Sequence, residues 1–122
     1  MSRKILVVED NDRNRRLLEI LLKAKGYEVI EAATGEEAMN CLKSQMPDLI
    51  LMDIQLPNMD GLALTRKIKN RTKTRDVNII AVTAYAMKGD RERILEAGCD
   101  AYISKPIDTR KLLLLIADLL EE

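Results

Sequence analysis

The chain has 122 residues, enough for one domain, and 47% of them are apolar although Trp and Phe are absent, so the core must be aliphatic. Twenty Lys and Arg residues balance twenty Asp and Glu residues, and this neutrality argues against a nucleic acid as the direct partner. The chain contains no histidine, which excludes a histidine kinase or a phosphohistidine carrier.

Five short strand patterns alternate with helix patterns along the chain. We expect strands at Lys4–Glu9, Glu28–Ala32, Asp48–Asp53, Val77–Val82 and Ala101–Ser104, and helices near Asn14–Lys25, Glu36–Ser44, Leu62–Asn70, Met87–Ala97 and Thr109–Leu120. Continuous apolar runs such as Ile5–Val8 and Leu49–Met52 are typical of parallel strands buried on both faces. The alternation therefore predicts an α/β fold, a doubly wound parallel sheet with helices on both faces, as a single domain over residues 1–122.

Cysteine content and hydropathy indicate a soluble protein. Cys41 and Cys99 lack the spacing of a metal or redox motif, and we expect both to be free, buried thiols. The longest apolar run, Leu112–Ala117, is far too short to span a bilayer, and the chain start has no signal-peptide pattern. We expect a cytoplasmic protein without membrane insertion.

Polar residues follow the carboxyl ends of the predicted strands, which is where open parallel sheets bind ligands. Glu9 and Asp10 stand at the end of the first strand, Asp53 ends the third, Thr83 follows the fourth and Lys105 follows the fifth. Each of them alone would most often be a helix cap, a turn residue or a solvated charge. If the first and third strands are neighbours, as in flavodoxin-like sheets, three carboxylates converge, and their repulsion is best explained by a bound cation.

The charges of this set match a divalent cation. Three carboxylates carry −3, and Lys105 with one divalent ion restores neutrality. Oxygen ligands without His or Cys favour Mg²⁺, or Mn²⁺ in its place, over zinc. Mg²⁺ is commonly shared with phosphate oxygens, so the set indicates phosphoryl transfer. Asp53, which ends the central strand, is the candidate nucleophile; Glu9 and Asp10 remain for the metal, and Thr83 and Lys105 for the phosphoryl oxygens.

Five segments, in order and at matching spacing, resemble the receiver domain of two-component response regulators, the CheY-like superfamily. The segments are Val7–Asn11, Leu51–Pro57, Met59–Gly61, Val82–Ala84 and Tyr102–Pro106. The resemblance implies a flavodoxin-like (βα)5 fold with strand order 2-1-3-4-5 and a cis bond between Lys105 and Pro106.

The same resemblance assigns roles to individual residues. Asp53 is implied as the phosphoacceptor, with Mg²⁺ held by Asp53, Asp10, the backbone carbonyl of Gln55 and, through water, Glu9. Thr83 and Tyr102 are implied as switch residues, and Lys105 as a contact of the phosphoryl group. Gln55 and Tyr85 occupy positions thought to tune dephosphorylation.

Segments Asp53–Pro57 and Thr83–Asp90 further resemble the DivK-like group of stand-alone receivers and the receivers of hybrid kinases, and the stand-alone group is the closer sub-type. This implies a single-domain response regulator of a phosphorelay, without an output domain and without enzymatic activity beyond its own Mg²⁺-dependent phosphorylation and dephosphorylation. The implied phosphodonor is a histidine kinase or a histidine phosphotransfer protein. The implied reader is an effector or kinase bound at the Met87–Leu120 surface, in cell-cycle or division control.

Two helices offer clues to signalling. The Met87–Ala97 helix contains Gly89 and has few apolar anchors, chiefly Met87 and Ile94, so it is either a movable element or simply a poorly anchored surface helix. In the last helix, Leu112, Leu115, Ile116, Leu119 and Leu120 share the predicted core face. Leu114 falls on the opposite face, and we hypothesise that it contributes to the partner surface together with Tyr102.

Three rival functions are open to the same fold. A haloacid-dehalogenase-type phosphatase needs a second Asp two residues after the nucleophile, where this chain has Gln55. A flavodoxin-type binder needs a phosphate-binding loop after the first strand, where this chain has the acidic segment Glu9–Asp12. A purely structural domain leaves the carboxylate set unexplained.

Overall fold

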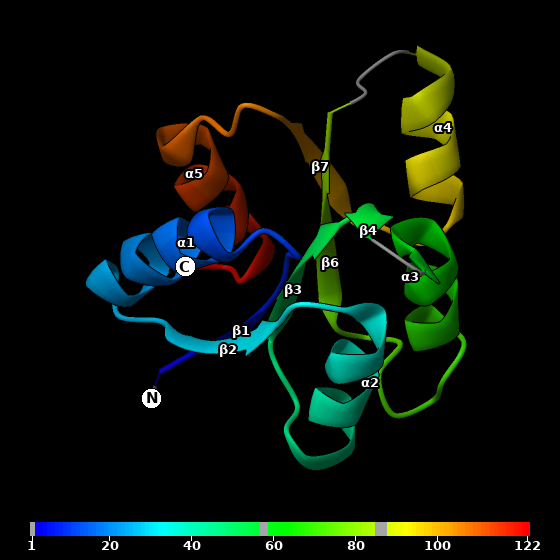
Figure 1. Cartoon of the computed structure of the whole chain (residues 1–122), viewed down its shortest axis with the longest axis horizontal. Coiled ribbons are helices and arrows are strands. Elements are labelled where there is room, and N and C mark those ends of the chain that lie inside the picture. Colours follow the sequence, from blue (N-terminus) through cyan, green and yellow to red (C-terminus); the bar gives the residue numbers. More distant parts are fainter. Residues whose placement is uncertain (1, 57–58, 85–87) are drawn as a thin grey trace.

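A five-stranded parallel sheet forms the centre of this computed structural model, which describes residues 2–56, 59–84 and 88–122. The strands are β1 (Lys4–Val8), β2 (Glu28–Ala32), β3 (Leu49–Asp53), β6 (Asn78–Thr83) and β7 (Ala101–Ser104). Their order across the sheet is β2-β1-β3-β6-β7 (Figure 1). The predicted flavodoxin-like order 2-1-3-4-5 is confirmed, because β6 and β7 are the fourth and fifth strands of this sheet.

Helices cover both faces of the sheet. Helices α1 (Asp12–Ala24) and α5 (Thr109–Leu119) pack on one face, and α2 (Gly35–Ser44), α3 (Gly61–Lys69) and α4 (Lys88–Glu96) pack on the other (Figure 1). Successive side chains of a strand point to opposite faces, so Ile5 and Val7 join the core under α1 and α5, and Leu6 and Val8 join the core under the other three helices. The two cores are therefore separated by the sheet itself.

Capping side chains set where several helices begin. The Asn11 side chain accepts a hydrogen bond from the Asn14 N–H at 2.9 Å, and Thr34 Oγ1 accepts one from the Glu37 N–H at 3.1 Å. These bonds satisfy amides of the first turn, so α1 and α2 begin one or two residues earlier than the sequence pattern predicts. Gly26 and Gly98 adopt φ of 91° and 109° just after α1 and α4, as expected for glycines that terminate helices.

A small antiparallel hairpin follows the central strand and was not predicted. Strands β4 (Gln55–Leu56) and β5 (Met59–Asp60) pair with each other beyond the end of β3. Asp60 then begins α3, because its Oδ1 accepts a hydrogen bond from the Leu62 N–H at 2.9 Å. The hairpin connects the end of the central strand directly to a helix N-terminus.

Other predictions hold with small corrections. β1 ends at Val8, not at Glu9, and the fourth strand of the sheet covers Asn78–Thr83, one residue later than expected. Both cysteines are free, and Cys99 is buried whereas Cys41 is only partly so. Of the helices in the described ranges, none is both long and apolar enough to cross a bilayer.

The last two helices largely match their predicted faces. Ile94 is buried in α4, whereas Met87, the other expected anchor, lies outside the described residues. In α5, Leu114 is 67% exposed, which confirms its predicted position. Leu115 and Leu119 are half-buried and pack against the core that contains Leu112, Ile116 and Leu120, as predicted. Leu113, which was not assigned to that face, also packs against this core.

Candidate functional site

Three carboxylates meet at the carboxyl edge of the sheet. β1 and β3 are neighbours, and Val8 pairs with Met52, so the residues that follow them come together. Carboxylate oxygens of Glu9, Asp10 and Asp53 lie within 4.8 Å of one another. Glu9 and Asp53 are buried and Asp10 is exposed, so the cluster has one side open to solvent. This donor set, all carboxylate oxygens with one open side, fits Mg²⁺ or Mn²⁺.

Both carboxylate oxygens of Asp53 have partners. Lys105 Nζ donates to Oδ2 at 3.1 Å, and the backbone N–H of Gln55 donates to Oδ1 at 2.9 Å. Lys105 is placed by its own N–H, which donates to the Thr83 carbonyl at 2.8 Å, and its peptide bond to Pro106 is cis, as expected. Two donors therefore orient a buried carboxylate that is only 3% exposed.

Burial and the neighbouring carboxylate of Asp53 change the pKa of Glu9. Burial raises its pKa from 4.5 to about 7, and a hydrogen bond and charge repulsion from Asp53 act in the same direction. The Asn11 N–H, which donates to Glu9 Oε2 at 3.3 Å, and Lys105 oppose this shift of the pKa. The raised pKa means that Glu9 holds its proton more readily than an ordinary glutamate, so without a bound cation the cluster carries less negative charge than three ionised carboxylates would.

Arg15 is a supporting residue that the sequence did not reveal. Its Nη1 donates to the Glu9 carbonyl at 2.9 Å, and its guanidinium pairs with Asp12 at 2.6 Å and with Glu31 at 3.4 Å. It thereby ties the backbone of Glu9 to the first turn of α1. The Asp12–Arg15 spacing of three residues on a helix was the available signal.

Gly61, at the start of α3, is a second residue that was missed. A Cβ atom added there would lie 2.4 Å from Ile54 Cα and 2.7 Å from the Asp53 carbonyl oxygen. The Gly61 N–H also donates to the Ile54 carbonyl at 3.1 Å. The segment Met59–Gly61 was recognised as part of a motif, but its role, a close approach of α3 to the backbone of Asp53, required the structure.

Of the two expected switch residues, Thr83 lies beside the cluster and Tyr102 lies one strand further away. Thr83 is fully buried at the end of β6, one residue beyond Val82, which pairs with Asp53. It also borders a pocket of about 260 Å³ between the β4–β5 hairpin and α4. Tyr102, on β7, is partly buried away from the carboxylates, and the Arg91 guanidinium lies 5.7 Å from its ring centroid. The structure thus gathers Glu9, Asp10, Asp53 and Lys105 around one point, with Thr83 adjacent.

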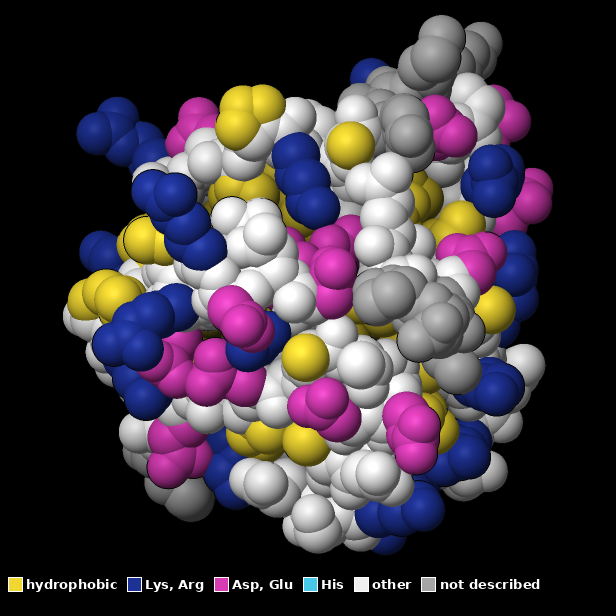
Figure 2. Space-filling model, in the orientation of Figure 1, with side chains coloured by type: hydrophobic (Ala, Val, Ile, Leu, Met, Phe, Trp, Pro, Cys, Tyr) yellow, Lys and Arg dark blue, Asp and Glu magenta, His cyan; other side chains and the backbone are white. Residues whose placement is uncertain are grey.

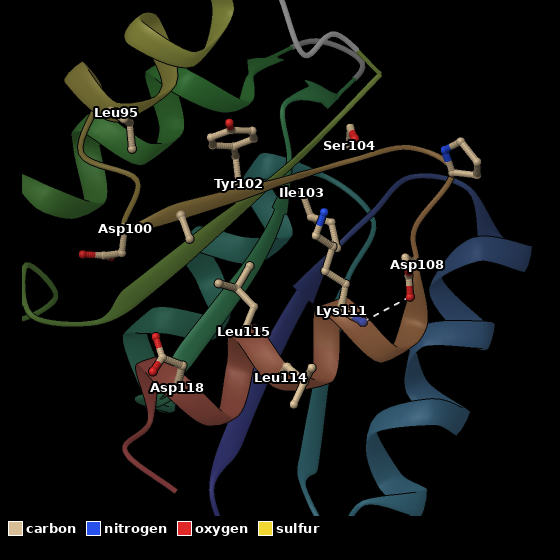
Figure 3. Close-up of a pocket in the computed structure, with 12 residues that line it drawn as sticks. Leu95, Asp100, Tyr102, Ile103, Ser104, Asp108, Lys111, Leu114, Leu115 and Asp118 are labelled. Atoms are coloured by element: carbon tan, nitrogen blue, oxygen red, sulfur yellow. Dashed lines mark hydrogen bonds between the residues drawn. The ribbon is translucent and has the colours of Figure 1, made fainter.

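The face formed by α4, β7 and α5 is hollowed next to Tyr102. Figure 3 shows Leu114 and Leu115 of α5 on one side of this groove and Leu95 of α4 on the other, with Tyr102 between them. The groove has a volume of about 690 Å³. Tyr85, which the sequence placed beside the site, lies outside the described residues.

Comparison with known proteins gives one consistent answer. The response regulator receiver domain family matches residues 5–117. The polar-differentiation response regulator DivK of Brucella ovis is 48% identical over 113 residues, which cover 93% of this chain and 92% of that protein.

Solved structures show the same similarity. A putative response regulator from Chloroflexus aurantiacus superposes with a TM-score of 0.94 at 30% identity, and each chain is fully covered. The receiver domain of a sensor histidine kinase of Pseudomonas aeruginosa superposes with a TM-score of 0.90 at 38% identity, again with full coverage of both chains. That domain was solved with a magnesium ion coordinated in its active-site cleft.

Proposed function

Because this chain belongs to the response regulator receiver domain family, we propose that it is a single-domain response regulator that accepts a phosphoryl group on Asp53 and thereby switches its binding of partner proteins. One observation carries the proposal. The buried Asp53 carboxylate shares a cluster within 4.8 Å with Glu9 and Asp10, and it lies 3.1 Å from Lys105 Nζ. A nucleophile, a cation site and a counter-charge are therefore combined in one place.

The proposed cofactor is Mg²⁺, with Mn²⁺ as a substitute. Glu9, Asp10 and Asp53 supply carboxylate oxygens for it, and the Gln55 carbonyl is a further candidate ligand. A bound divalent ion would offset the repulsion among the carboxylates and the charge of an incoming phosphoryl group. The magnesium ion of the Pseudomonas aeruginosa receiver supports this assignment.

The proposed chemistry is transfer from a phosphohistidine. An Asp53 oxygen forms the new bond to phosphorus while the bond between phosphorus and the donor imidazole breaks, and the imidazole retains that electron pair. The reacting carboxylate is already oriented by the Gln55 N–H and by Lys105. The product carries about −2 charge and three strong acceptor oxygens, for which Lys105 Nζ and the Thr83 hydroxyl are the proposed donors.

The proposed partners follow from the same assignment. A histidine kinase or a histidine phosphotransfer protein supplies the phosphoryl group, and an effector or kinase reads the Met87–Leu120 surface, of which residues 88–120 are described. Tyr102 and Leu114 border the groove of that surface (Figure 3). For phosphorylation to change this surface, a movement of Thr83 must alter the position of Tyr102, which lies on the adjacent strand. As the pathway we propose cell-cycle or division control; the relative from Brucella ovis is named a polar-differentiation response regulator.

Mass measurement tests the proposal. The protein is incubated with acetyl phosphate and Mg²⁺, and its intact mass is compared with that of the Asp53→Asn variant. We expect one added phosphoryl group in the original protein and none in Asp53→Asn or after chelation of the metal. Asp118→Asn, which alters an exposed carboxylate on α5, should be phosphorylated normally. An adduct that persists in Asp53→Asn, or no adduct with any phosphodonor, contradicts the proposal.

A further inference from the structure

A strongly cationic segment lies away from the phosphorylation site. Residues 61–75 contain six of the twenty cationic side chains of the chain and none of its acidic ones. Lys69 points inward, but the other five are exposed, and we call them the cationic surface: Arg66, Lys67, Arg71, Lys73 and Arg75. Figure 2 shows Lys and Arg side chains gathered along the lower right edge of the molecule, where Figure 1 places the end of α3 and the turn after it.

The charges of this surface are not neutralised within the described residues. Some helical cations elsewhere in the described residues have partners one turn away, as in the Asp12–Arg15, Glu19–Lys23 and Asp90–Arg93 pairs. The five cations form no ion pair with any described residue. Lys67 lies in α3, and Arg71 and Arg75 follow at four-residue spacing in the turn after it, where the Arg75 N–H donates to the Arg71 carbonyl at 2.9 Å. Like charges four residues apart on such a helical turn repel each other. The helix dipole favours cations at the end of α3, but it does not account for those beyond it.

The backbone that carries these cations is held in place. Thr74 is buried, and its Oγ1 donates to the Ile68 carbonyl at 2.5 Å. Lys69 Nζ donates to the carbonyls of Arg75 and Val77, at 3.2 and 2.7 Å, and to Asp100 Oδ2 at 3.0 Å. The turn is therefore ordered before any partner arrives, which reduces the entropy lost on binding.

From these contacts we propose that the cationic surface docks an acidic segment of a partner protein. Three of its five residues are arginines, whose planar guanidinium groups bind carboxylates in pairs of hydrogen bonds. A nucleic acid fits less well, because the chain has no net positive charge and residues 61–75 contain no aromatic side chain on which a base could stack. A membrane also fits less well, since the exposed large apolar side chains of the described residues all lie outside this segment.

Docking at this surface does not depend on the phosphorylation site. The cationic turn precedes β6, whose first residue Asn78 pairs with Leu49 at the start of β3, whereas Asp53 is the last residue of β3. The two sites are thus at opposite edges of the sheet. A partner held at the cationic surface stays bound whether or not Asp53 is modified, so this inference stands or falls separately from the proposed function.

Fluorescence anisotropy with a labelled oligoglutamate peptide tests the inference. The test variant is the triple change Arg66→Gln, Arg71→Gln and Arg75→Gln. The control is Arg13→Gln, Arg16→Gln and Lys25→Gln, which removes the same charge from exposed positions in and just after α1. We expect the test variant to weaken peptide binding by at least about threefold more than the control, and binding to weaken between roughly 50 and 150 mM salt. Asp53→Asn should bind the peptide as the original protein does.

Any of four outcomes overturns the inference. The peptide does not bind at low salt, or the test and control variants lose equal affinity for it. A single-stranded oligonucleotide of equal charge binds more tightly than the peptide and loses affinity in the test variant. Vesicles that contain phosphatidylglycerol bind in preference to the peptide and lose affinity in the test variant. Thermal unfolding of both variants shows beforehand that each is folded.

Discussion

Replacement of Gly61 by alanine tests how tightly α3 is joined to the phosphoacceptor. The added methyl group would lie 2.4 Å from Ile54 Cα, 2.7 Å from the Asp53 carbonyl oxygen and 3.1 Å from the Ile54 carbonyl carbon. All three are backbone atoms, which cannot rotate away as a side chain could. The φ of Gly61 lies outside the left-handed region, so alanine is not disfavoured by its own backbone and the cost arises from these contacts.

Relief of the overlap requires a shift of the backbone at Asp53 and Ile54. Overpacking of this kind typically costs about 1–3 kcal/mol of unfolding free energy. With a urea m-value of about 2 kcal/mol/M, the midpoint of urea unfolding should fall by about 0.5–1.5 M. The carboxylate of Asp53 moves with its backbone, so phosphorylation by acetyl phosphate should also be slower in Gly61→Ala.

Gly89→Ala is the matched control, since it makes the same chemical change in open space. A Cβ at Gly89 meets no atom within 4 Å, and the residue is exposed in α4. Alanine is the better helix former by up to about 1 kcal/mol, so this variant should be slightly more stable than the original protein. A Gly61→Ala midpoint equal to that of the original protein, or a loss of equal size in Gly89→Ala, would refute the contact argument.

Three further predictions concern single side chains. In metal-free buffer, thermal unfolding should show stability falling as the pH rises from 4.5 to about 7, because the folded state holds a proton on Glu9 that the unfolded state releases. The loss is at most about 3 kcal/mol at pH 8, and Glu9→Gln should abolish it. A stability that does not change with pH in the original protein argues against the raised pKa of Glu9. Lys69→Met removes the donor to the carbonyls of Arg75 and Val77 and one of the two donors to Asp100 Oδ2, so it should lower the unfolding free energy in urea by about 1–3 kcal/mol. Exposed Lys67→Met should change that free energy by less than about 0.5 kcal/mol, and equal effects would contradict the structural role of Lys69. Leu114→Ala should leave the unfolding midpoint nearly unchanged, because the Leu114 side chain is 67% exposed. The same variant should bind the cognate kinase or effector more weakly in calorimetric titration, and an unchanged affinity rules out a role of Leu114 at the partner surface.

The strands and the carboxylate cluster could be predicted because the relevant signals are local in the sequence. Continuous apolar runs identify strands buried on both faces, and the residues directly after them must lie at one edge of a parallel sheet. The sequence therefore predicts that Glu9, Asp10, Asp53 and Lys105 lie together. The structure confirms their convergence, with the carboxylate oxygens within 4.8 Å and Lys105 Nζ 3.1 Å from Asp53.

The missed features depend on contacts between segments. The β4–β5 hairpin has strands of two residues each, which are too short to show any periodicity. The need for glycine at position 61 arises from the backbone of Asp53 and Ile54, which is close to it only in the folded chain. The raised pKa of Glu9 likewise follows from its burial. The position of a residue directly after a strand does not reveal in the sequence how deeply its side chain is buried.

The separation of the interior into two cores has a consequence for protein engineering. Leu18 and Ile116 belong to the core under α1 and α5, whereas Leu64 and Ile94 belong to the core under α3 and α4. Because the sheet stands between them, side chains of the two cores share few neighbours, and the stability effects of their substitutions should add within about 0.5 kcal/mol. Mutant libraries for the two cores can therefore be selected separately and then recombined. The number of variants to be screened is then the sum of the two library sizes instead of their product.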